Sequence, residues 1–206
     1  MGGNTKTTER EEINVYALAE THLRDLEAPP VIENYLWEGC NRTAGMKKGG
    51  GVGMLIKQGT DWQRVHECCK EHLWVKGTIA GKNTWLGVAY LWTGSGVREE
   101  NEQMMNCLRR DINEFKDSGE ITLLGDMNAH IEDLDGYTDH NGGMMLDLCQ
   151  ENELVIVNTE NKCDGQITWE SGDRQSSIDY SLVSETVYER LWEMKIDENG
   201  TVTTRG

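Results

Sequence analysis

Short apolar segments of strand character recur along the chain, and amphipathic helical segments lie between them. Strands are predicted at residues 13–18, 49–57, 121–124, 154–158, 166–170 and 176–184, and a hairpin at 72–92, around Gly81-Lys82-Asn83. Helices are predicted over residues 98–118, which end before Gly119, and over 142–153. Because strands outnumber helices and hairpins are mixed with crossovers, the pattern predicts an α/β sandwich with mixed sheets.

The chain is strongly acidic. Its 206 residues are enough for one domain with a buried core. The 20 Lys and Arg against 36 Asp and Glu give a formal net charge of −16. This charge has the wrong sign for a protein that binds nucleic acid over a wide surface, so we expect no extended basic surface. A local acidic site that collects a divalent metal ion is compatible with it.

The sequence carries no signal of export or membrane insertion. No stretch approaches the roughly 18 unbroken apolar residues of a membrane helix, and the N-terminus lacks the apolar core of a signal peptide. The 6 cysteines are scattered without a C-x-x-C pair, which favours free thiols in a reducing compartment. We therefore expect an intracellular protein without a membrane partner, and the nucleus is one candidate location.

Acidic and amide groups recur where the predicted strands end. Glu20 follows the first strand, Asp126 and Asn128 follow the strand 121–124, and Asp179 lies within the last strand. Loops at strand ends are where sites are usually built in open α/β sheets. A hard cation such as Mg²⁺ prefers carboxylate oxygens and keeps several waters. The Asp-x-Asn spacing on extended backbone places both side chains on one side, so one group can face water and the other a phosphate.

The motifs that contain these residues resemble the endonuclease/exonuclease/phosphatase superfamily, the DNase I-like phosphodiesterases. They are most similar to the endonuclease domains that non-LTR retrotransposons carry beside their reverse transcriptase. The matching segments, in the family's order, are "ALAETHLRD", "GGGVGMLIK", "GVAYLWTGSG", "LLGDMNAHI" and "ITWESGDRQSSIDYSLVS". The resemblance implies a DNase I-like four-layered α/β sandwich with two mixed β-sheets.

The resemblance also implies roles for individual residues. Glu20 matches the family's metal-binding glutamate, and Tyr90 matches the active-site tyrosine near the scissile phosphate. Asp126 matches the aspartate that activates the attacking water, and Asn128 the asparagine that orients the phosphate. Asp179 matches the aspartate that orients the catalytic histidine. The implied reaction is hydrolysis of a DNA phosphodiester by in-line attack of water, with Mg²⁺, or alternatively Mn²⁺, as cofactor.

The chain departs from the family pattern at both ends. The polar segment 1–12 stands where the family has an early strand that carries an asparagine. The family's closing S-D-H strand, which supplies a metal aspartate and the catalytic histidine, has no counterpart before Gly206. Asp139-His140 precedes the Asp179 strand and therefore cannot take that place. We expect a domain over residues 13–206 that lacks the first and last strands, and hence weak or no nuclease activity.

Simpler interpretations exist for each residue. Asp126 and Asn128 are also ordinary turn residues, Glu20 a solvated carboxylate, and Tyr90 a core aromatic. Asp179 in an apolar strand needs a partner, because a buried unpaired charge is costly. His130 follows the Asp-x-Asn motif and lines the site or, more simply, is a loop histidine with a local hydrogen bond.

Three functions are compatible with these patterns. The first is a Mg²⁺-dependent endonuclease of the retroelement type that cleaves DNA. The second is a non-catalytic relic or truncated gene product of the same fold, acting at most as a binding module. The third is a small-molecule phosphatase of the same superfamily, against which "AETHL" argues.

Overall fold

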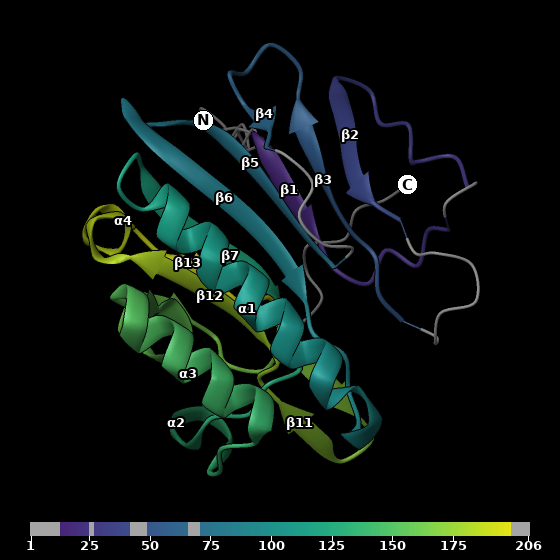
Figure 1. The fold of residues 1–206 in the computed structure, drawn as a ribbon, viewed down its shortest axis with the longest axis vertical. Helices are drawn as coiled ribbons and strands as arrows, with labels where there is room; N and C mark the ends of the chain where they lie inside the picture. Colours follow the sequence, from purple (N-terminus) through teal and green to yellow (C-terminus); the bar gives the residue numbers. More distant parts are fainter. Residues whose placement is uncertain (1–12, 25–26, 42–48, 66–70, 199–206) are drawn as a thin grey trace, which may run out of the picture.

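The computed structural model describes residues 13–24, 27–41, 49–65 and 71–198 (Figure 1). Within these ranges a six-stranded sheet, here called the large sheet, has the order β4 (Gln63–Arg64), β5 (His72–Ile79), β6 (Lys82–Tyr90), β7 (Glu120–Asp126), β12 (Asp179–Ser184), β8 (Leu154–Ile156). It is mixed, because β6 and β7 run parallel while the other pairs are antiparallel.

A three-stranded sheet among the same residues, the small sheet, has the order β1 (Val15–Leu18), β3 (Val52–Lys57), β2 (Tyr35–Cys40). Its strand pairs are all antiparallel, so only the large sheet is mixed. Two minor pairs complete the strands: the hairpin β10 (Trp169–Ser171) with β11 (Arg174–Ser176), and the parallel pair β9 (Cys163–Asp164) with β13 (Met194–Lys195).

Two long helices, α1 (Arg98–Phe115) and α3 (His140–Asn152), cover one face of the large sheet (Figure 1). The short helical elements are η1 (Ser95–Val97), α2 (Glu132–Asp135), η2 (Val157–Thr159) and α4 (Glu185–Arg190). The small sheet packs against the opposite face of the large sheet. Helices, large sheet and small sheet thus form three layers among the described residues. The predicted α/β sandwich is confirmed, whereas the fourth layer that the resemblance implies is not formed by these residues.

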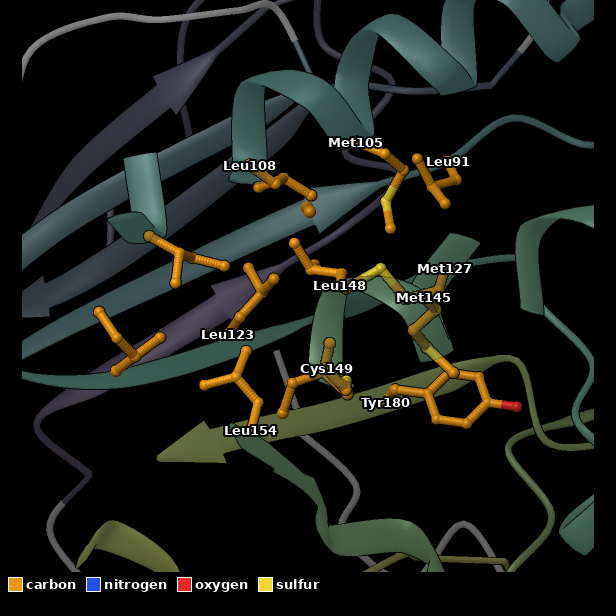
Figure 2. Close-up of a cluster of buried hydrophobic side chains, with 14 of the residues drawn as sticks. Leu91, Met105, Leu108, Leu123, Met127, Met145, Leu148, Cys149, Leu154 and Tyr180 are labelled. Carbon is orange, nitrogen blue, oxygen red and sulfur yellow. The ribbon is translucent and has the colours of Figure 1, made fainter. Parts of the chain in front are cut away.

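The helix-covered face of the large sheet holds the main hydrophobic core. Leu108 and Met105 of α1 point toward Leu123 of β7 and toward side chains of α3, as Figure 2 shows. Phe115 stacks on Trp85 with ring centroids 4.1 Å apart and meets Trp74 edge-on. The apolar residues of α1 therefore recur with the 3.6-residue period of a helix and form one buried stripe.

The core between the two sheets explains why β6 is apolar from Trp85 to Tyr90. Leu86 and Val88 face β3 of the small sheet, whereas Trp85 and Ala89 face the helices. A strand buried on both faces loses the alternation of apolar and polar residues. Its hairpin with β5 turns at Ala80-Gly81, both at positive φ.

The structure differs from the sequence predictions in several elements, and the short elements β4, β9, β13 and α4 were not predicted. Strand β2 was not predicted, because the segment before it contains the turn residues Pro29 and Pro30. Helix α1 ends at Phe115, a few residues earlier than predicted. The last predicted strand, 176–184, divides into the end of β11 and β12. Residues 1–12, on which the expectation of a missing first strand depends, lie outside the described residues.

Candidate active site

Tyr90, Asp126 and Asp179 lie in one row across three adjacent strands. Asp126 ends β7, Tyr90 is its register partner on the parallel strand β6, and Asp179 is its partner on the antiparallel strand β12. Residues paired in this way project from the same face of the sheet with Cβ atoms about 5 Å apart. Like charges directly opposite each other destabilise a sheet, so two facing carboxylates cost stability here unless a proton or a ligand relieves their repulsion.

Close approach of the backbones makes this row possible. A Cβ atom at Gly125 would lie 2.0 Å from the carbonyl oxygen of Ala89 on β6. The glycine before Asp126 therefore lets β6 and β7 approach until their ends align. Beyond the strand end, the Leu91 amide donates to the Asp126 carbonyl oxygen at 2.9 Å and extends the alignment by one residue.

The Asp126 carboxyl group is buried, with 8% of the residue exposed. Its Oδ1 atom accepts a hydrogen bond from the Asn128 amide at 3.0 Å. Burial, followed by repulsion from the Asp179 carboxylate, raises the pKa of Asp126 to about 7. A carboxyl group with a pKa near neutrality exchanges protons readily at physiological pH, which suits a general base.

Asn128 is held in an unusual backbone conformation by its neighbours. Its φ of 40° lies in the left-handed region, which Asn tolerates better than most residues. Its side-chain Nδ2 donates to the Leu91 carbonyl oxygen at 2.7 Å. Its own carbonyl oxygen accepts from Asn141 Nδ2 of α3 at 2.9 Å.

A buried pair of asparagines connects the two helices to this loop. Asn101 of α1 donates from Nδ2 to Asn141 Oδ1 at 3.1 Å, and it also pairs with both backbone groups of Trp92. Both asparagines are less than a tenth exposed. The sequence analysis missed them, although Asn101 stands on the same helical stripe as Met105 and Leu108, where a polar residue is a signal.

Glu20 reaches the row from the small-sheet side. It follows β1 with a φ of 52°, and its Oε1 accepts a hydrogen bond from Tyr90 Oη at 2.9 Å. Burial and the Glu20 carboxylate raise the pKa of Tyr90, so its hydroxyl stays a hydrogen-bond donor. This contact joins the small sheet to the large sheet at the site.

A glycine segment held by Glu71 supports the Glu20 loop. The Gly51 and Gly50 carbonyl oxygens accept from the Thr21 and His22 amides at 3.0 and 3.1 Å. Gly51 N in turn donates to Glu71 Oε2 at 2.7 Å, and Glu71 is 1% exposed. The three glycines at positive φ thus form a tight turn that supports the Glu20 loop.

Asp179 has a hydroxyl partner. Its carboxylate is hydrogen-bonded by the Thr168 side chain, whose Oγ1 also accepts from the Asp179 amide at 3.0 Å. Partial loss of hydration inside the cavity wall, together with the Glu20 charge, raises the pKa of Asp179 even though the residue keeps solvent access. Among the described residues, no imidazole is hydrogen-bonded to this carboxylate. Thr168, in the "TW" motif, is a site residue that the sequence analysis did not single out.

All five predicted site residues line one cavity of about 950 Å³. Its wall includes Glu20, Tyr90, Asp126, Asn128 and Asp179 from the predicted set, and also His130, Asp135, Tyr137, Trp169, Asp173 and Arg174. A second cavity of about 610 Å³ adjoins it and shares His130 and Asn128. The structure therefore brings the predicted residues together, while their catalytic roles stay predictions.

Comparison with known proteins agrees with this arrangement. The model of the endonuclease-reverse transcriptase family matches residues 89–201, which contain the Tyr90, Asp126 and Asp179 row. The chain belongs to this family. No curated protein sequence matches the chain.

Solved structures share the fold of this family member. The endonuclease domain of TRAS1, a telomere-specific non-LTR retrotransposon, is similar with a TM-score of 0.62 at 14% identity, covering 85% of this chain and 75% of that one. The AP endonuclease LMAP from Leishmania major has a TM-score of 0.70 at 13% identity, with 87% and 72% covered. A humanized D. rerio TDP2 has a TM-score of 0.51 at 14% identity, with 84% and 71% covered. The endonuclease/exonuclease/phosphatase fold is thus confirmed.

The donor chemistry of the cavity fits a hard divalent cation. Glu20, Asp126 and Asp179 repel one another, which a bound cation would relieve. Among the described residues, no three His, Cys, Asp or Glu side chains form a ready cage for a metal ion. Mg²⁺ does not require such a cage, because it is usually held by one or two carboxylates with water and substrate phosphate.

Among the described residues, no helix has the length and apolarity to cross a membrane.

Proposed function

We propose that this domain hydrolyses DNA phosphodiester bonds at a low rate, with Mg²⁺ or Mn²⁺ as cofactor, as a retroelement-type endonuclease. The convergence of Glu20, Tyr90, Asp126, Asn128 and Asp179 on one cavity carries this proposal. DNA would be a local substrate, contacted at its backbone, because a net charge of −16 offers no extended basic surface. A chromosomal target would place the protein in the nucleus.

Each residue has a role that its surroundings allow. Asp126, with a pKa of about 7, takes the proton of the attacking water. Tyr90 and Asn128 are donors that orient the phosphate, and Glu20 is the carboxylate that would hold the metal. When bound, the metal ion supplies charge neutralisation at the phosphate. The products are a phosphate monoester and an alcohol, formed by cleavage of one P–O bond.

The low rate follows from the surroundings of Asp179. An imidazole bonded to this carboxylate would stabilise charge on the phosphate, but the described partner is the Thr168 hydroxyl. Loss of one member of a cooperating catalytic set commonly lowers kcat by several orders of magnitude. The names of the similar structures, an endonuclease domain and an AP endonuclease, support DNA as the substrate class.

Nicking of supercoiled plasmid DNA tests the proposal. We expect slow conversion to open circles with Mg²⁺, none with EDTA, and none with Asp126→Ala. The matched control is Asp147→Ala, which removes an exposed carboxylate of α3 outside the cavity and leaves nicking unchanged. DNA binding without nicking would replace the proposal by a non-catalytic binding module. Release of inorganic phosphate from small monoesters would indicate a phosphatase.

A further inference from the structure

His130 lies where the two cavities meet. It lines the main cavity together with Asp126 and Asp179, and it also lines the adjoining cavity. Among the described residues that line the main cavity it is the only imidazole. Its side chain is 24% exposed, so the ring is largely packed yet keeps an open edge. A half-buried imidazole at the junction of two polar cavities can contact a bound molecule.

His130 is held by two contacts of its ring and by contacts of its backbone. Nδ1 lies 2.9 Å from Asp135 Oδ2, and the ring stacks on Tyr137 with centroids 4.8 Å apart. The backbone of His130 exchanges two hydrogen bonds with Asp139, which is the N-cap of α3. Helix α3 approaches so closely that a Cβ atom at Gly142 would lie 1.9 Å from the His130 carbonyl oxygen. These contacts fix the orientation of the ring before any ligand binds.

The contact with Asp135 decides which nitrogen is available. A carboxylate accepts a hydrogen bond from Nδ1–H, so this nitrogen carries a proton and Nε2 is left for a ligand. Within the described part of the chain, Nε2 makes no hydrogen bond to protein. Asp135 is itself fixed, since its other oxygen accepts from the Ser177 amide at 3.3 Å. Asp135 therefore holds the His130 imidazole in one orientation, unlike a surface histidine that rotates freely.

We propose that His130 binds a phosphate oxygen of the substrate through Nε2, with Asp135 as the residue that positions it. This inference rests on the proposed function. The bound form is the imidazolium, which donates from both nitrogens: Nδ1–H to Asp135 and Nε2–H to the phosphate. The ionisable groups that line the two cavities with the ring are mostly acidic: Asp135, Tyr137 and Asp139 beside it, Glu20, Tyr90, Asp126 and Asp179 across the main cavity, Asp173 and Arg174 on the hairpin, and Arg98 and His140 in the adjoining cavity.

A purely structural role makes a different demand on the ring. If His130 only connected its loop to α2, the hydrogen bond from Nδ1 to Asp135 would be sufficient, whereas phosphate binding needs Nε2 as well. Phosphate rather than metal is the favoured ligand, because Mg²⁺ prefers oxygen ligands, whereas an Nε2–H donor matches a phosphate oxygen. An imidazolium would also add positive charge to a cavity that must accept a phosphate anion among five carboxylates, those of Glu20, Asp126, Asp135, Asp173 and Asp179.

Nitrogen-15 NMR of the histidine side chains tests the proposal in the full chain. The His130 resonance is assigned by its loss in His130→Gln, and His140→Gln serves as the matched control, because His140 pairs with Glu102. The probes are inorganic phosphate and then a short DNA duplex, with Mg²⁺ present. We expect a Nε2 shift confined to His130, reduced in Asp135→Asn. We also expect His130→Gln to lower kcat/KM for nicking about 10²-fold.

The outcomes separate this inference from the proposed function. If DNA shifts the backbone amides of Asp126 and Asn128 while His130 Nε2 stays unchanged, the substrate binds without His130 and the inference is wrong. If phosphate shifts His130 Nε2 but plasmid nicking is absent, His130 binds phosphate and the proposed hydrolysis is wrong. If neither probe shifts any resonance of the cavity and no nicking occurs, both are overturned.

Discussion

The two faces of the large sheet differ in how firmly they are packed. On the helix side, Leu108, Leu123 and Leu148 are fully buried in one continuous cluster. On the other side, all four residues of β1 are only half-buried, and Leu36 of β2 is 55% exposed. Regions with few buried apolar contacts open at lower free energy than the core of the same domain. On this side β3 is buried, so the flanking strands β1 and β2 are the parts expected to open more easily than the helix-covered core.

The candidate active site crosses this boundary. Tyr90, Asp126 and Asp179 stand on the large sheet, whereas Glu20 comes from the loop after β1. The glycine segment and Glu71 connect the loop to the large sheet, because the Glu71 carbonyl oxygen accepts from the Tyr90 amide at 2.9 Å. The placement of Glu20, the residue proposed to hold the metal, thus depends on β1, a strand that is only half-buried.

Truncation of a core leucine is expected to have the largest effect on stability. Leu108→Ala should lower the free energy of unfolding by about 3 kcal/mol, because it removes buried methyl groups and leaves a cavity. Leu36→Ala, at the exposed edge of the small sheet, should change it by less than about 0.5 kcal/mol. Urea unfolding followed by tryptophan fluorescence measures both. Equal losses would show that the two faces of the large sheet are packed equally well.

Removal of the Glu71 side chain is expected to have an intermediate effect. Glu71→Ala leaves the buried Gly51 amide without its acceptor, which should lower the free energy of unfolding by about 2 kcal/mol. Glu71→Gln keeps an acceptor oxygen and should lose less than half as much. Thermal unfolding compares the two variants. If alanine and glutamine cost the same, the carboxylate charge rather than the hydrogen bond stabilises the glycine segment.

The smallest of the three expected effects is a gain in stability, on replacement of Asp126 by Asn. The pKa of Asp126 rises from 3.8 to about 7 on folding. Between these values the unfolded chain holds fewer protons than the folded chain, so stability falls as the pH rises and the loss is complete above about pH 7. The shift sets an upper limit of roughly 4 kcal/mol. Without metal, Asp126→Asn should therefore raise the free energy of unfolding by about 1 kcal/mol at pH 8 while abolishing nicking.

The pH dependence is the check on this third prediction. Below about pH 4 the wild-type carboxyl group is protonated in both states, so urea unfolding in EDTA should give nearly equal stabilities for wild type and Asp126→Asn. A gain of the same size at pH 4 and pH 8 would mean that packing, and not charge, causes the difference.

The elements that carry the site could largely be predicted from the sequence, because their signals are local. The segment that ends in Asp126 and the apolar stripe of α1 are periodic patterns, and both elements are present. Strand β2 could not be predicted, since its Trp37 lies over Gly39 and Gly53 and this pairing appears only when β2 and β3 are side by side. Local patterns do not encode such a tertiary contact.

The supporting contacts of the site were beyond local patterns for the same reason. Glu71 and Glu20 are 51 residues apart in the sequence, and the glycine segment between β2 and β3 and Tyr90 connect them. His130 was interpreted as a loop histidine or a site residue, and the Asp135 bond and the shared cavity show that both descriptions apply. Spacing alone does not tell which nitrogen of the ring stays open.

Because of the hydrogen bond from Tyr90 to Glu20, the geometry of the site depends on how the two sheets pack together. A single contact of 2.9 Å closes the cavity across the inter-sheet boundary, so docking of the sheets and assembly of the site are one event. Warming that separates β1 from the rest of the small sheet would displace Glu20, the proposed metal ligand, while α1 and α3 stay folded over their leucine core. Activity would then disappear at a lower temperature than helical structure, and the gap between the two temperatures would measure the strength of the docking.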